Sequence, residues 1–101
     1  MSKTVLQAAD AITDLPFVGK DPDGKSTFWQ VEASGDWGTD GKTGEAYAQI
    51  FVERIRAGQR RPLLAWIVRD MVCAGPARWS GMEVGFLQYI ERASARFMTL
   101  R

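Results

Sequence analysis

The segment from Pro62 to Gly75, PLLAWIVRDMVCAG, is the feature that most constrains the fold of this 101-residue chain. Only Arg69 and Asp70 interrupt its apolar character. In a helix with about 3.6 residues per turn, its apolar side chains would cover nearly the whole circumference instead of one stripe. Such a helix must be enclosed by other elements or by a second chain. Pro62 favours the start of this helix, and Gly75-Pro76 favours its end.

Two amphipathic helices are predicted on either side of this apolar segment. The first spans about residues 43–57, with Thr43 as its cap and Gly58 as the left-handed residue that ends it. The second spans about residues 81–98 and follows a capping-box pattern from Ser80 to Glu83. A shorter helix over about residues 3–13 is also expected, so the chain has three to four helices.

One short strand is predicted beside the helices. Thr27–Ala33, TFWQVEA, is rich in β-forming residues and partly alternates, whereas Pro16 and the turn at 21–24 exclude regular structure from about 14 to 26. The strand must pair with a short loop segment or with its own copy in a dimer. We therefore expect one mainly α domain over residues 1–101, with three to four helices around a central apolar helix (62–75) and one accessory β-strand (27–33).

The composition excludes several classes of function. The chain has no histidine and a single cysteine, Cys73, which removes the usual general base, histidine-activated nucleophiles and most zinc sites. Its net charge of +1 gives no strong attraction to nucleic acid or anionic membranes. The apolar runs at 63–68 and 71–74 are far shorter than the roughly 20 residues that span a bilayer. We expect a cytoplasmic protein that is not an enzyme, has no cofactor or metal, and keeps Cys73 buried and inert.

Two glycine-rich segments come close to phosphate-binding patterns. Gly19–Ser26 matches G-x-x-x-x-G-K-[ST], but it precedes the predicted strand instead of a helix. Asp21 and Asp23 would also place negative charge in the anion cradle, so we predict an exposed turn. Residues 35–44 belong to a predicted glycine-rich loop before a helix. A small anion- or phosphate-binding protein, or an enzyme that uses this loop and its Lys42, is therefore an alternative function.

Charged residues in the middle of the chain allow a second alternative. The arginines between 54 and 69 could belong to a DNA-binding helical module, but Glu53 and Asp70 intervene and no aromatic residues alternate with them, which favours a solvated face. Arg69 and Asp70 are each expected to pair with a residue of another helix, because charges within an apolar helix need partners.

Aromatic residues supply the candidate partner-binding surface. Trp29 and Trp66 lie in the predicted strand and the central helix, and we expect both in the core. Trp37 and Trp79 lie in connecting segments, where exposed aromatic side chains are typical of protein–protein hot spots, although either indole could equally cap the core. With aromatic residues of the amphipathic helices, the candidate partner-binding residues are Trp37, Tyr47, Trp79, Phe86, Tyr89 and Phe97.

Three segments together resemble a known family. GDWGTDGKTGEAYAQIFVERIRAG (35–58), RPLLAWIVRDMV (61–72) and SGMEVGFLQYIERA (80–93) are similar in length, helix order and texture to the small bacterial quorum-sensing anti-activators. That family consists of compact, mainly helical proteins that bind and disable LuxR-type transcription factors. The resemblance carries no diagnostic motif and transfers no individual binding residue. It implies a homodimeric protein–protein interaction module that sequesters a transcriptional regulator by stoichiometric binding and blocks its dimerisation or DNA binding.

Overall fold

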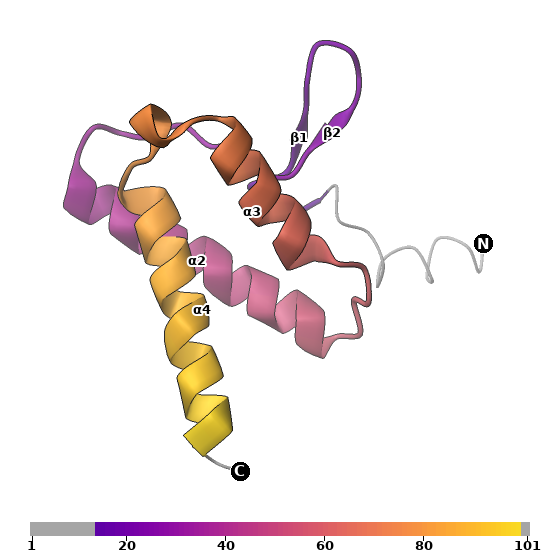
Figure 1. Cartoon of the computed structure of the whole chain (residues 1–101), viewed down its shortest axis with the longest axis vertical. Coiled ribbons are helices and arrows are strands. Elements are labelled where there is room, and N and C mark those ends of the chain that lie inside the picture. Colours follow the sequence, from indigo (N-terminus) through magenta and orange to yellow (C-terminus); the bar gives the residue numbers. More distant parts are fainter. Residues whose placement is uncertain (1–13, 100–101) are drawn as a thin grey trace.

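Three helices and a two-stranded hairpin form the described part of the chain, residues 14–99 of a computed structural model (Figure 1). The predicted helix over 3–13 lies outside these residues. The mainly α fold class is confirmed. The elements are β1 (Gly19–Lys20), β2 (Ser26–Thr27), α2 (Trp37–Arg56), α3 (Leu63–Cys73), a short 3₁₀ turn η1 (Pro76–Arg78) and α4 (Gly81–Thr99).

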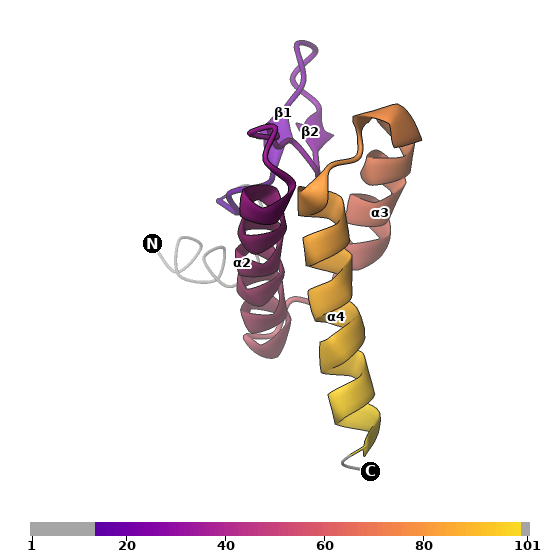
Figure 2. The same cartoon turned by 90° about the vertical axis from the view of Figure 1, so that its left-hand side faces the viewer.

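The N-terminal halves of α2 and α4 are in direct backbone contact (Figure 2). A Cβ atom on Gly85 would lie 2.2 Å from the Gly41 carbonyl oxygen, and one on Gly44 would lie 2.1 Å from the Met82 carbonyl oxygen. A Cβ atom on Gly81 would lie 2.3 Å from the Trp37 carbonyl oxygen. Only hydrogen fits at these three positions, so the glycines allow the two helices to approach more closely than side chains permit.

This contact corrects the predicted glycine-rich loop at 35–44. Most of that segment is helical, because α2 begins at Trp37 instead of Thr43. Asp36 is the N-cap: its Oδ2 accepts hydrogen bonds from the backbone N–H and the hydroxyl of Thr39. Each glycine costs a helix about 1 kcal/mol relative to alanine. Packing against α4 offsets this cost. The sequence pattern along α2 alone does not reveal that packing.

A buried carboxylate stabilises the entry into α2. Asp40 is only 2 % exposed, and it accepts hydrogen bonds from the backbone N–H of Ser34 at 2.9 Å and from its hydroxyl at 2.8 Å. The backbone hydrogen bond from Ser34 is the main reason that the pKa of Asp40 lies below its ordinary value of 3.8. The charged form of Asp40 therefore ties residues 34–36 to the first turns of the helix.

The predicted boundaries of α4 and the predicted glycines that follow α2 and α3 are confirmed. Ser80 and Glu83 form the capping box: the Ser80 N–H donates to Glu83 Oε1 at 2.6 Å, and the Met82 N–H donates to Ser80 Oγ at 3.2 Å. Gly58 and Gly75 have left-handed φ angles of 112° and 94°, as expected after α2 and α3.

The apolar helix α3 is buried along one stripe only. Leu63, Ile67 and Met71 are at most 1 % exposed, whereas Val72 is 60 % exposed and Cys73 is also exposed. The other described elements of the same chain therefore do not enclose this helix on nearly all sides, and the prediction of a buried cysteine is wrong. The physical reason is that α2 and α4 pack on each other, so together they cover a single face of α3.

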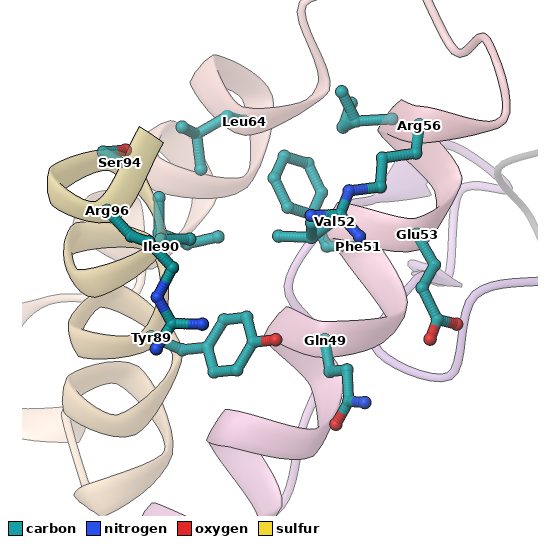
Figure 3. A pocket seen from close by; sticks show the side chains of 12 residues that line it. Gln49, Phe51, Val52, Glu53, Arg56, Leu64, Tyr89, Ile90, Ser94 and Arg96 are labelled. Carbon is teal, nitrogen blue, oxygen red and sulfur yellow. The ribbon is translucent and has the colours of Figure 1, made fainter. Parts of the chain in front are cut away.

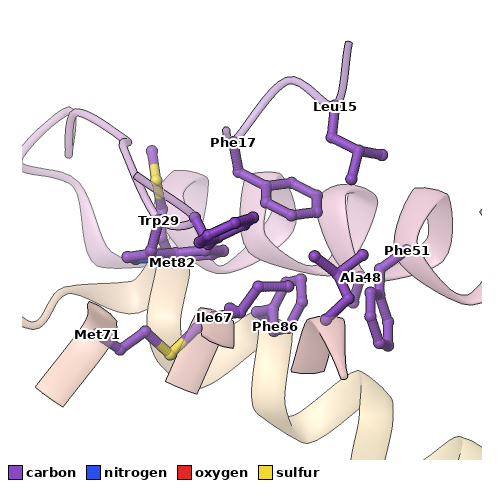
Figure 4. Packing of buried hydrophobic residues seen from close by; sticks show 11 residues of the cluster. Leu15, Phe17, Trp29, Ala48, Phe51, Ile67, Met71, Met82 and Phe86 are labelled. Atoms are coloured by element: carbon purple, nitrogen blue, oxygen red, sulfur yellow. The ribbon is translucent and has the colours of Figure 1, made fainter. Parts of the chain in front are cut away.

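Phe86 lies at the centre of the core (Figure 4). Its ring centroid is 5.0 Å from that of Trp29, 5.7 Å from that of Phe17 and 5.8 Å from that of Phe51. These aromatic contacts join α4 and α2 to the segment that contains the hairpin and its flanking residues, here called the hairpin segment. Trp29 is fixed further by its indole N–H, which donates to the buried carboxylate of the α4 residue Glu83 at 2.8 Å. Trp29 is thus a core residue, as predicted.

Only Thr27 of the predicted strand at 27–33 lies in β2, and β1 forms at Gly19–Lys20, within the segment where no regular structure was expected. Pairing is within the chain and antiparallel, with Gly19 opposite Thr27 and Lys20 opposite Ser26. The N–H of Phe28, next along the chain, donates to Asp70 Oδ2 of α3 at 2.8 Å. The Gln30 N–H then donates to the Phe17 carbonyl at 2.8 Å, outside the register of the regular ladder.

The expected partners of Arg69 and Asp70 are also corrected. The two side chains pair with each other, Arg69 Nε to Asp70 Oδ1 at 3.1 Å, and neither has an ion pair with another helix in the part of the chain that is described. Asp70 is satisfied by this neighbour and by the Phe28 backbone, so an interhelical cation is not needed.

Replacing Gly44 with alanine tests the backbone contact. We expect Gly44→Ala to lower the free energy of unfolding by about 1–3 kcal/mol, because the methyl group would overlap the Met82 carbonyl. Gly38→Ala in the same helix is the matched control: nothing lies within 4 Å of the place that its methyl group would occupy, so helix propensity should raise stability by up to about 1 kcal/mol. Urea unfolding measures both, and equal stability of the two variants would contradict the contact.

The Asp40 carboxylate predicts a specific pH dependence. Because its pKa is lowered by folding, its stabilising effect is fully present above its ordinary pKa of 3.8 and is lost as the pH falls through the lower folded value. Asp40→Asn should therefore be less stable than the wild type at neutral pH, and the difference should narrow below about pH 4. Urea unfolding over a pH series measures this, with Asp23→Asn in the exposed hairpin turn as the control. A pH-independent difference between Asp40→Asn and the wild type would contradict the role of its charge.

Candidate functional site

An apolar groove lies between the C-terminal halves of α2 and α4 (Figure 3). The helices run in the same direction from their glycine contact and then separate, which opens a space of about 720 Å³. Leu64 adds a side chain from α3. The lining residues are Gln49, Phe51, Val52, Glu53, Ile55, Arg56, Leu64, Tyr89, Ile90, Ala93, Ser94 and Arg96.

The walls of the groove follow helical spacing on both sides. Val52 and Ile55 are three residues apart on α2, and Ile90 and Ala93 are three apart on α4, so each pair lies on one helix face. Ile55 is 40 % exposed and lies in the same groove as Val52, Ile90 and Ala93, so the apolar surface here is continuous. The open end of the groove thus presents apolar surface to solvent.

The last turns of α4 extend past the rest of the molecule (Figures 1 and 2). Between Glu91 and Arg96, only Ala93 is partly buried, and the other side chains are exposed. A helix end without tertiary packing is marginally stable alone. The extended end of α4 therefore offers one wall against which a further element could pack.

Of the predicted partner-binding residues whose side chains the structure describes, only Tyr89 lines this groove. Tyr47 is half-buried beside Phe17. Trp79 is half-buried too, with its indole N–H donating to the Met71 carbonyl at 2.9 Å. Phe86 is fully buried in the core and cannot contact a partner.

The two remaining predicted residues lie elsewhere. Trp37 is 62 % exposed at the start of α2, far along the helix from the groove. The side chain of Phe97 lies outside the described part of the structure. Sequence analysis missed Val52, Ile55, Ile90 and Ala93 as surface residues, because an apolar helix face looks the same whether it covers a core or lines a groove.

Neither phosphate-like segment forms an anion cradle. Gly19–Ser26 is the hairpin turn: Asp21 Oδ1 accepts from the N–H groups of Asp23 and Lys25 at 3.0 and 2.9 Å, and a strand follows. At the start of α2, the carboxylate of Asp36 already accepts from the Thr39 N–H, where an anion would have to bind. This geometry argues against the anion-binding alternative at either segment.

The arginines of the middle segment do not gather into one basic face. Arg54 forms a two-point ion pair with Asp14, at 3.0 and 3.1 Å, and its hydrogen bonds are the main cause of the lowered pKa of Asp14. Arg69 pairs with Asp70. These pairs neutralise two of the cations that the DNA-binding alternative would need.

A second hollow of about 550 Å³ lies between the hairpin segment and the end of α3. Cys73, Asp70 and Glu83 line it, but both carboxylates already accept hydrogen bonds, from the Phe28 backbone and the Trp29 indole. Within residues 14–99, no group of three or more acidic, cysteine or histidine side chains could hold a metal ion.

Comparison of the whole sequence with known protein families, with curated proteins and with solved structures finds no match. Among the described helices, none combines the length and apolar character needed to cross a membrane. The apolar groove between α2 and α4 is therefore the feature from which a function can be argued.

Proposed function

We propose that this chain is a protein–protein interaction module that inhibits a bacterial transcriptional regulator by stoichiometric binding in the cytoplasm. The observation that carries the proposal is the apolar groove between the C-terminal halves of α2 and α4. Its occupant is an amphipathic helix of the regulator, which lays its apolar face between Ile55 and Ile90. A groove between two helices is a common way to bind such a helix.

The dimensions of the groove support a helix as the occupant. Its volume of about 720 Å³ can accept several large side chains from one face of a helix, and its walls present aliphatic side chains from both α2 and α4. The rigid glycine contact at the other end fixes the separation of these walls. A preformed site of this kind loses little conformational entropy when the partner binds.

The identity of the partner comes from the resemblance to quorum-sensing anti-activators, which gives a LuxR-type transcription factor as the target. The mechanism is occlusion: a regulator helix held in the groove is no longer free for self-association or DNA binding. One chain must be present for each regulator chain, because the inhibitor is not turned over. Inhibition should therefore reach completion near equimolar protein.

Ile55→Gln tests the groove directly. This exposed residue can be changed without opening the core, and we expect the affinity for the regulator to fall by about 1–2 kcal/mol, or roughly five- to thirtyfold. The measurement is release of the LuxR-type regulator encoded in the same genome from fluorescent operator DNA, followed by anisotropy. Ala46→Gln, exposed on the same helix but outside the groove, is the control. The proposal is wrong if the regulator stays on DNA at equimolar inhibitor, or if Ile55→Gln acts like the control.

A homodimer is part of the same proposal. The exposed face of α3 is a suitable contact between copies, because it carries Val72 and Cys73 beside half-buried Val68. Light scattering at micromolar concentration should give about twice the chain mass of 11.3 kDa. Val72→Asp should reduce the mass to that of one chain, since it places a charge at the centre of the contact. A wild-type monomer at this concentration would exclude the dimer.

A further inference from the structure

Two arginines stand at the mouth of the groove, one on each helix (Figure 3). Arg56 extends from the end of α2 and Arg96 from the projecting part of α4, and both side chains reach toward the space between the helices. Both residues are exposed. Among the described residues, Glu53 is the only acidic one that lines the groove, so their charges at the mouth sum to a positive value.

These arginines differ from the other arginines of the three α-helices. Arg54, Arg69 and Arg92 each have a carboxylate within 4 Å, from Asp14, Asp70 and Glu45 respectively. Arg56 and Arg96 have no ion pair within residues 14–99. Their guanidinium groups therefore remain available to a bound molecule.

We propose that the helix accepted by the groove is acidic, with carboxylates flanking its apolar stripe that pair with Arg56 and Arg96. This inference rests on the proposed function and specifies the chemistry of the partner. Guanidinium groups bind carboxylates in a two-point geometry, and side chains beside an apolar stripe on a helix fall at the edges of the groove when the stripe is seated. The charges orient the helix and speed its association, while the apolar walls supply most of the affinity.

Two synthetic helices provide the probes. Each is a fluorescent peptide of about 18 residues, long enough to span the groove, with the same leucine and phenylalanine stripe. One carries glutamate on both sides of the stripe and the other carries lysine. Anisotropy at low ionic strength should show tighter binding of the glutamate peptide, and high salt should reduce the difference because the rim charges are exposed.

Charge variants of the full chain test whether Arg56 and Arg96 cause the preference for the glutamate peptide. Arg56→Glu and Arg96→Glu should each weaken the glutamate peptide by about two- to fivefold at low salt and strengthen the lysine peptide. Glu53→Lys should strengthen binding of the glutamate peptide and weaken binding of the lysine peptide. Lys42→Glu is the matched control, since it makes the same charge change at an exposed position of α2 outside the groove. Circular dichroism checks that each variant is folded.

The possible results separate the two proposals. If the lysine peptide binds as tightly as the glutamate peptide, or if both arginine variants behave like Lys42→Glu, the partner is not acidic and this inference is overturned. The helix-binding function would still stand in that case, provided that Ile55→Gln weakens both peptides. If neither peptide binds the wild-type chain, the proposed function fails and this inference fails with it.

Discussion

The close backbone contact between α2 and α4 is the interaction on which the rest of the structure depends. Gly44, Gly81 and Gly85 leave no room for a Cβ atom. In the N-terminal halves of these helices, backbone carbonyl groups of one helix therefore lie against the Cα atoms of the other. Two helices that touch this closely at one end and run in the same direction must separate at the other end, because larger side chains such as Phe51 and Tyr89 stand between them there. The glycines thus determine both where the core is tight and where the groove opens.

Three carboxylates attach the non-helical parts of the chain to this helical frame. Asp40 accepts from Ser34, Asp70 accepts from the Phe28 backbone, and Glu83 accepts from the Trp29 indole. Each bond joins a segment without regular structure to a helix, and no buried side-chain polar atom among the described residues lacks a partner. The hairpin segment can therefore place Phe17 and Trp29 against Phe86 although its own ladder is only two residue pairs long.

The groove connects this architecture with the proposed function. A small domain that packed all its apolar helix faces inward would have nothing to offer an amphipathic helix. Here α3 covers one side of the α2–α4 pair near the contact, while Ile55 and Ala93 remain accessible farther along. In the proposed complex, Arg56 and Arg96, which have no ion pair within residues 14–99, add electrostatic selection to a mostly apolar surface. Such an arrangement gives specificity at the rim and affinity at the centre of an interface.

The sequence by itself determined the helix boundaries that depend on local chemistry. The capping box at Ser80, the left-handed glycines at 58 and 75, and the mainly α class follow from neighbouring residues, and all are confirmed. Only the tertiary structure decided which apolar faces are buried. Phe86 and Ile55 both belong to apolar faces of amphipathic helices, yet one is at the core and the other lines a groove. The glycines between 38 and 44 favour a loop locally, yet the segment is helical, and the missing side chain of Gly44 allows backbone contact with α4, a partner far away in the sequence.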